Sequence, residues 1–127
     1  MPQVKEGLYY TPEHEWLEVK GRFAYLGLTD YAQKKLGVIL FADGEPEGSE
    51  LTAGDVAGVV ESVRESADLV TPVSGVITAF NGKLSDTPEA LNDHPYDFWL
   101  VELALSDPGE LSDLMSAREY DAYCSGL

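Results

Sequence analysis

The sequence predicts a mainly β protein, a compact barrel or sandwich of short strands. Short apolar segments recur along the chain of 127 residues, and turn-forming glycine, proline, aspartate and asparagine separate them. Few segments show the longer period of a helix. A chain of this length suits one domain, residues 1–127, which can bury a core but has no residues to spare for a separate catalytic domain.

The first elements are a hairpin and a helix. Residues 14–20 and 22–28 flank a glycine and are rich in aromatic and aliphatic side chains, which is typical of paired strands. Thr29 is placed to cap a short helix over residues 30–36, and Gly37 is placed to end it.

The rest of the chain predicts further strands joined by turns rich in glycine, proline and aspartate. The expected strands are residues 38–42, 56–61, 69–71, 76–80 and 98–105. The expected turns are residues 43–48, 52–55 and 72–75.

Helices are expected only at the edges of the fold. Residues 85–89 favour a short helical turn before Asn92. Residues 108–115 and 116–123 predict a helical pair over one end of the sheet, and Ser116 with Glu119 has the spacing of a capping box.

Charge is the strongest compositional signal, with 8 basic and 23 acidic residues and a net charge of −15. Such a surface repels nucleic acid and anionic lipid and attracts basic protein surfaces, which are the expected partners. The alternative explanation is that the acidic residues serve only solubility, or that they are an adaptation to a salty cytoplasm. With no apolar run as long as a membrane span and no signal-peptide pattern at the start, we expect a cytoplasmic monomer, or a mitochondrial-matrix protein only if a transit peptide has been removed.

Residues that carry chemistry give no sign of an enzyme. His14 and His94 are far apart and lack zinc-like spacing to a cysteine or carboxylate, so we expect His14 in the first hairpin and His94 in a loop. Ser74 is not in a nucleophile elbow, and no glycine-rich phosphate loop occurs. The lone Cys124 is expected to be a packed helix residue.

Several motifs, in order along residues 9–123, resemble the glycine cleavage system H protein family. They are Tyr10-Thr-Pro-Glu-His-Glu-Trp16, Gly27-Leu-Thr-Asp-Tyr-Ala-Gln33, Val59-Val-Glu-Ser-Val63, Pro72-Val-Ser-Gly75, Leu91-Asn92, Pro95-Tyr96, Trp99-Leu100 and Glu119-Tyr120. The resemblance implies a barrel-sandwich hybrid of two small sheets, with an acceptor residue on a hairpin tip and helices to one side. It also implies a carrier: a lipoyl-lysine arm takes a methylamine group from glycine decarboxylase, presents it to aminomethyltransferase and is reoxidised by dihydrolipoamide dehydrogenase.

The same resemblance implies the site residues. Arg64 stands at the lipoyl-acceptor position, while Glu61, three residues before it, and Gly75, eleven after it, match the family's flanking signature. Glu15 and Asp68 match positions that line the cleft for the loaded arm, or they face Arg64 instead.

Arginine at this position is the main departure from the family pattern. A guanidinium stays protonated and is a poor nucleophile, so it retains the charge of lysine but not its acylation chemistry. The lysines are Lys5, Lys20, Lys34, Lys35 and Lys83, none of them in the hairpin. Because Glu65, Ser66 and the loop at residues 44–48 also depart from the pattern, natural divergence is favoured over a laboratory substitution.

Three hypotheses follow for the function. The first is an H-like protein without lipoate, and with no cofactor on this chain, that acts by contact with glycine decarboxylase, aminomethyltransferase, dihydrolipoamide dehydrogenase or a lipoate ligase. The second is an ordinary H protein with an engineered Arg64. The third is a small-ligand binding module that uses the vacated arm cleft.

Overall fold

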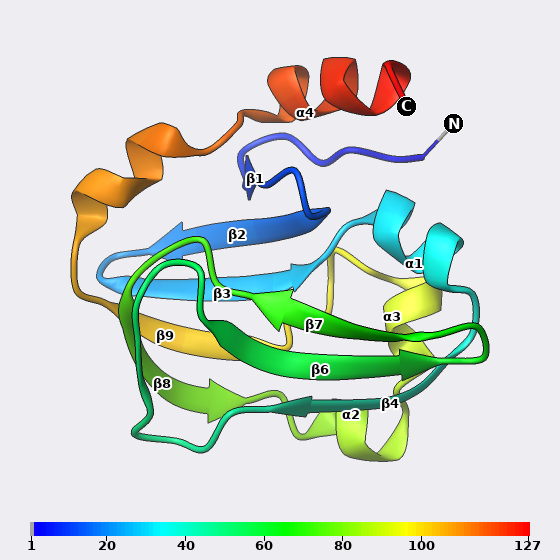
Figure 1. Ribbon diagram of the computed structural model, residues 1–127, viewed down its shortest axis with the longest axis horizontal. Coiled ribbons are helices and arrows are strands. Elements are labelled where there is room, and N and C mark those ends of the chain that lie inside the picture. Colours follow the sequence, from blue (N-terminus) through cyan, green and yellow to red (C-terminus); the bar gives the residue numbers. More distant parts are fainter. Residues whose placement is uncertain (1) are drawn as a thin grey trace.

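Two antiparallel sheets dominate the computed structural model, which describes residues 2–127, so that Met1 lies outside the described residues. One sheet has six strands in the order β1-β2-β3-β9-β8-β5, and the other has three in the order β4-β6-β7 (Figure 1). The strands are β1 Tyr9–Tyr10, β2 Glu15–Lys20, β3 Phe23–Leu28, β4 Ile39–Gly44, β5 Glu50–Leu51, β6 Val56–Ser62, β7 Ser66–Val70, β8 Gly75–Phe80 and β9 Val101–Leu105. The expectation of a mainly β fold with two small sheets is confirmed, and neither sheet closes on itself.

The helices are short and lie outside the sheets (Figure 1). They are α1 Asp30–Leu36, α2 Lys83–Asp86, α3 Ala90–Asp93, a 3-10 helix Pro108–Asp113 and α4 Ala117–Ser125. None of the helices in residues 2–127 has the length and apolar character that crossing a membrane requires.

The main core lies between the two sheets. Leu26 of β3 and Leu103 of β9 belong to the six-stranded sheet, and Val60 of β6 and Leu69 of β7 belong to the three-stranded one; all four are at most 1 % exposed. They pack in one cluster, so burial of apolar surface holds the sheets together.

A second cluster joins α4 to the β1 edge of the large sheet. Tyr10 and Tyr120 are fully buried, and their rings stack 4.6 Å apart. The Tyr120 hydroxyl lies 2.7 Å from His14 Nδ1 and 2.8 Å from Thr29 Oγ1. The predicted capping box of α4 is confirmed, because Ser116 and Glu119 exchange both of its hydrogen bonds.

Helix α1 forms where the sequence predicts it. Thr29 Oγ1 accepts from the Ala32 N–H, which is one of the donors that a helix N-terminus leaves unpaired. Gly37, at φ 78°, ends the helix and donates to the Gln33 carbonyl.

Some predicted boundaries are wrong, for identifiable reasons. Residues 85–89 are not one helical turn, because Pro88 lacks an N–H and forces Thr87 out of helical geometry, which separates α2 from α3. The 3-10 helix ends at Asp113, and Met115 instead pairs with Tyr10 as an isolated bridge. The strand predicted over residues 98–105 begins only at Val101, and β7 starts at Ser66 rather than residue 69.

Candidate functional site

The tip of the β6–β7 hairpin is a tight turn that Ser62 holds in place. Its hydroxyl oxygen accepts from the N–H groups of Arg64 and Glu65, each at 3.1 Å, and its own N–H donates to the Glu65 carbonyl. The Val63 N–H donates to the Val38 carbonyl at 3.0 Å, so the tip is also bonded to the residue that precedes β4. The turn therefore has a defined backbone geometry.

Arg64 points from this tip toward the C-terminus of α1. Its Nη1 donates to the Lys34 and Lys35 carbonyls at 3.1 and 2.8 Å. These are carbonyls of the last helical turn, which lack an intrahelical partner and carry partial negative charge. Figure 1 shows the tip beside the segment that leaves α1.

Gly37 leaves space for the guanidinium in this arrangement. A Cβ on Gly37 would lie 3.3 Å from both Cζ and Nε of Arg64. The residue that ends α1 therefore also permits close approach of the arginine. Within residues 2–127 Arg64 forms no ion pair with Glu15 or Asp68, and its partners are these two carbonyls.

Glu61 and Asp68 both lie on the side of the three-stranded sheet that faces away from the core. Glu61 pairs with Phe41 on one side and Ser66 on the other, and all three are exposed. Asp68 pairs with Val59 and is also exposed. The structure thus brings these two predicted site residues onto one surface.

Glu15 is placed differently from the other predicted residues. It begins β2, is only 2 % exposed, and its Oε2 accepts from the Val70 N–H at 2.7 Å. Its Oε1 also accepts from the Thr11 hydroxyl at 3.2 Å. Burial raises the pKa of the Glu15 carboxyl to about 8, since desolvation disfavours the charged form and the two hydrogen bonds only partly offset it. Glu15 therefore ties the large sheet to β7 rather than presenting a carboxylate at the surface.

Gly75 begins β8 at a point of close backbone approach. It pairs with Leu51 of β5 and with Leu105 of β9. A Cβ at this position would overlap the Ala104 carbonyl oxygen. The pairing of three strands is enough to require glycine there.

No group of three or more potential metal ligands gathers within residues 2–127. Of the five lysines, Lys34 and Lys35 are on α1 and none is on the hairpin, so the tip presents a guanidinium where an implied lipoyl group would need an amine. The residues present do not fit covalent lipoate at residue 64.

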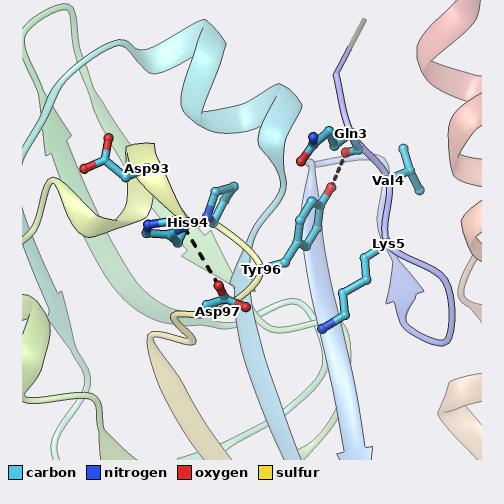
Figure 2. A pocket seen from close by; sticks show the side chains of 8 residues that line it. Gln3, Val4, Lys5, Asp93, His94, Tyr96 and Asp97 are labelled. Carbon is cyan, nitrogen blue, oxygen red and sulfur yellow. Dashed lines mark hydrogen bonds and ion pairs between the residues drawn. The ribbon is translucent and has the colours of Figure 1, made fainter.

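A separate groove of about 540 Å³ opens between the N-terminal segment and the loop after α3 (Figure 2). His94 lies there, in the loop as predicted, with its Nδ1 3.9 Å from Asp97. Tyr96, which also lines the groove, donates to the Gln3 carbonyl at 2.5 Å. None of the lining residues belongs to the hairpin, so the groove is distinct from the predicted site.

Sequence reasoning missed the apolar side chains that surround the tip. Val38, Leu40, Phe41 and Val63 are 46–59 % exposed. The run Val38-Ile-Leu-Phe-Ala42 predicts a strand, but the register shifts between Ile39 and Phe41, so that Leu40 and Phe41 are both exposed. An apolar run without polar alternation carries no signal for such a bulge.

The comparisons with known proteins agree with one another. The family model for the glycine cleavage H-protein matches residues 8–126. The glycine cleavage system H protein of Thermoanaerobacter sp. (strain X514) is 46 % identical over 121 residues, covering 95 % of this chain and 96 % of the relative. That of Salinibacter ruber is 46 % identical over 116 residues, covering 91 % and 94 %. A crystal structure of a glycine cleavage system H protein from Mycobacterium marinum superposes with a TM-score of 0.85 at 31 % identity, covering 98 % of this chain and 100 % of the other.

Proposed function

Because the chain belongs to the glycine cleavage H-protein family, we propose that it is an H-like protein that lacks the lipoyl group and acts through protein contacts. Members of this family are lipoyl carriers rather than catalysts, and they work with the other enzymes of glycine cleavage. The proposed partners are glycine decarboxylase, aminomethyltransferase, dihydrolipoamide dehydrogenase and a lipoate ligase. Bound to one of them, this protein would scaffold, regulate or compete with a lipoylated H protein.

The observation that carries the proposal is the state of Arg64. Lipoate attachment requires a neutral amine that attacks an activated acyl group, and a guanidinium remains protonated with its lone pairs delocalised. Arg64 in addition donates to the last carbonyls of α1, at 2.8 and 3.1 Å, so the side chain caps a helix. Glu61 and Gly75, which flank the acceptor position in the family pattern, are retained.

A lipoylation assay tests the missing carrier function. The protein is incubated with a purified lipoate ligase, lipoate and ATP, and its intact mass is measured. We expect no change for the wild type and the gain of one lipoyl group for Arg64→Lys, because the hairpin and its turn remain. Lys34→Arg/Lys35→Arg in each background controls for modification of the neighbouring helix, which carries both lysines. A lipoyl adduct on the wild-type protein would contradict the proposal.

Direct binding and inhibition test the contact function. The purified protein is titrated against each of the four proposed partners, and it is also added to glycine cleavage assays that contain a lipoylated H protein. We expect binding to at least one partner and a matching loss of glycine cleavage. If none of the four enzymes binds, this part of the proposal is abandoned.

The two other hypotheses have weaker support. A ligand between Glu15 and Asp68 would need both carboxylates at a cleft, whereas Glu15 is 2 % exposed and engaged with Val70 and Thr11. An ordinary carrier with an engineered arginine is distinguished by codon 64 of the natural gene.

A further inference from the structure

We propose that the outer face of the three-stranded sheet docks a basic, amphipathic segment of a partner protein. This outer face comprises Phe41, Asp43, Val59, Glu61, Ser66 and Asp68. The inference rests on the proposed function, which requires protein contacts, and it assigns the surface that makes them.

The strand register places these six side chains together. In antiparallel pairs, residues directly opposite one another point to the same side of the sheet. Phe41, Glu61 and Ser66 form one row across the three strands, and Asp43, Val59 and Asp68 form the next. The row between them, Ala42, Val60 and Ala67, faces the core.

Apolar surface is left uncovered on this side of the sheet. Phe41 is 46 % exposed, and Val56, at the far end of the hairpin, is 40 % exposed. A groove of about 430 Å³ crosses the face, lined by Val56, Val59 and Pro46 together with the carboxylates of Asp43, Glu45 and Asp68. Two valines and a proline in the groove, with Phe41 exposed on the same face of the sheet, suit an apolar anchor of a partner.

The charge of the face determines which partner fits. The three strands carry Asp43, Glu61 and Asp68 and contain no lysine, arginine or histidine. The nearest cation along the chain, Arg64, directs its guanidinium to the α1 carbonyls. No ion pair within residues 2–127 involves the three acids. Their charge is therefore open to a basic segment.

The same charges disfavour the other occupants. A second copy of this chain, with a net charge of −15, would bring two acidic faces together, and nucleic acid or an anionic membrane would be repelled in the same way. A basic protein segment gains both from the carboxylates and from burial of Phe41.

The first test maps the surface without any enzyme. An amphipathic peptide of alternating lysine and leucine is titrated into the ¹⁵N-labelled protein, and amide shifts are followed by NMR at 50 and 300 mM NaCl. We expect the shifts to concentrate in β4, β6 and β7 and to weaken with salt. Shifts distributed over the acidic surface in general, or no binding, would overturn the proposal.

The second test uses purified aminomethyltransferase and glycine decarboxylase. Phe41→Ser removes the apolar anchor, and the double variant Asp43→Asn/Asp68→Asn removes two charges. The matched controls are Leu127→Ser and Asp113→Asn/Asp121→Asn, which alter exposed residues of the C-terminal region. We expect the face variants to raise Kd about tenfold or more and the controls to stay within about twofold.

The two tests separate failure of the surface from failure of the function. If neither enzyme binds but the peptide shifts map to the outer face, the proposal of glycine-cleavage partners is rejected. The proposal that this face is a docking surface is then retained. If the enzymes bind and both face variants retain wild-type affinity, the docking surface is overturned and the contact function stands. Circular dichroism of each variant verifies that a loss of binding is not a loss of fold.

Discussion

A single side chain changes what the hairpin tip can do. Lysine on a tight turn can present a nucleophilic amine, whereas Arg64 presents a planar donor that fits two helix carbonyls at once. A cation at an exposed helix C-terminus contributes about 0.3–1 kcal/mol at low ionic strength, which is enough to favour one direction of the side chain. Arg64 therefore caps the neighbouring helix, where a lysine would present an amine for modification.

Glu15 should make the stability of this protein depend on pH. The folded-state pKa of the Glu15 carboxyl is about 8, against an ordinary value of 4.5, because the group is buried. Between these two values the native state holds a proton that the unfolded state has released, so the free energy of unfolding falls as pH rises. Relative to Glu15→Gln, we expect the wild type to lose on the order of 2–4 kcal/mol between pH 5 and pH 8.

Urea unfolding of both proteins at pH 5, 6, 7 and 8 measures this difference. Glutamine preserves the acceptor for the Val70 N–H, so the substitution changes the titration with little loss of packing. Glu47→Gln, in an exposed loop, is the control and should leave the pH dependence as in the wild type. If the free energy of unfolding depends on pH in the same way in wild type and Glu15→Gln, the Glu15 carboxyl is not the cause of the pH dependence.

At the scale of elements, Gly75 allows three strands to meet. It connects β5, β8 and β9, and a Cβ there would collide with the Ala104 carbonyl. We expect Gly75→Ala to lower the free energy of unfolding by about 1–3 kcal/mol, because the strands must separate to accommodate it. The urea midpoint measures the loss.

Gly82→Ala is the matched control for that substitution. Gly82 has φ −60°, and a methyl group added there would meet no atom within 4 Å, so alanine should leave stability unchanged or slightly raise it. If Gly75→Ala unfolds at the wild-type midpoint, the three strands accommodate the methyl group and glycine is not required where they meet.

Local signals explain which elements could be predicted from the sequence. Thr29 and Gly37 bound α1, and Ser116 with Glu119 opens α4, because caps depend on a few neighbouring residues. The mainly β class followed from turn spacing. The bulge at Leu40 could not be predicted, because it depends on pairing between strands rather than on the strand itself.

The candidate site divides in the same way. The resemblance to the H-protein family predicted residue 64 at a hairpin tip, whereas the partners of Arg64 lie about 30 residues earlier in the chain and become neighbours only in the fold. The burial of Glu15 was likewise unpredictable, since its partner Val70 belongs to the other sheet.

For the whole molecule, the excess of acidic residues affects the stability of the fold as well as the choice of binding partners. Of the charged residues, 23 are acidic and 8 basic, and only Lys20–Glu18 and Lys34–Asp30 form ion pairs between carboxylates and lysines within residues 2–127. Most carboxylates therefore repel one another in the compact state more than in the expanded unfolded chain.

Screening that repulsion should stabilise the protein. The Debye length falls from about 30 Å at 0.01 M salt to about 3 Å at 1 M, so we expect the thermal midpoint to rise by several degrees between 10 mM and 500 mM NaCl. Differential scanning calorimetry at constant pH measures the shift.

The triple variant Glu47→Gln/Asp113→Asn/Asp121→Asn changes the net charge from −15 to −12 at exposed positions, and its thermal midpoint should depend less steeply on salt. Sucrose, which does not screen charge, separates this effect from general solute exclusion. A midpoint that stays flat in NaCl, or a triple variant with the wild-type slope, would mean that the acidic excess does not oppose folding and acts only on encounters with other molecules.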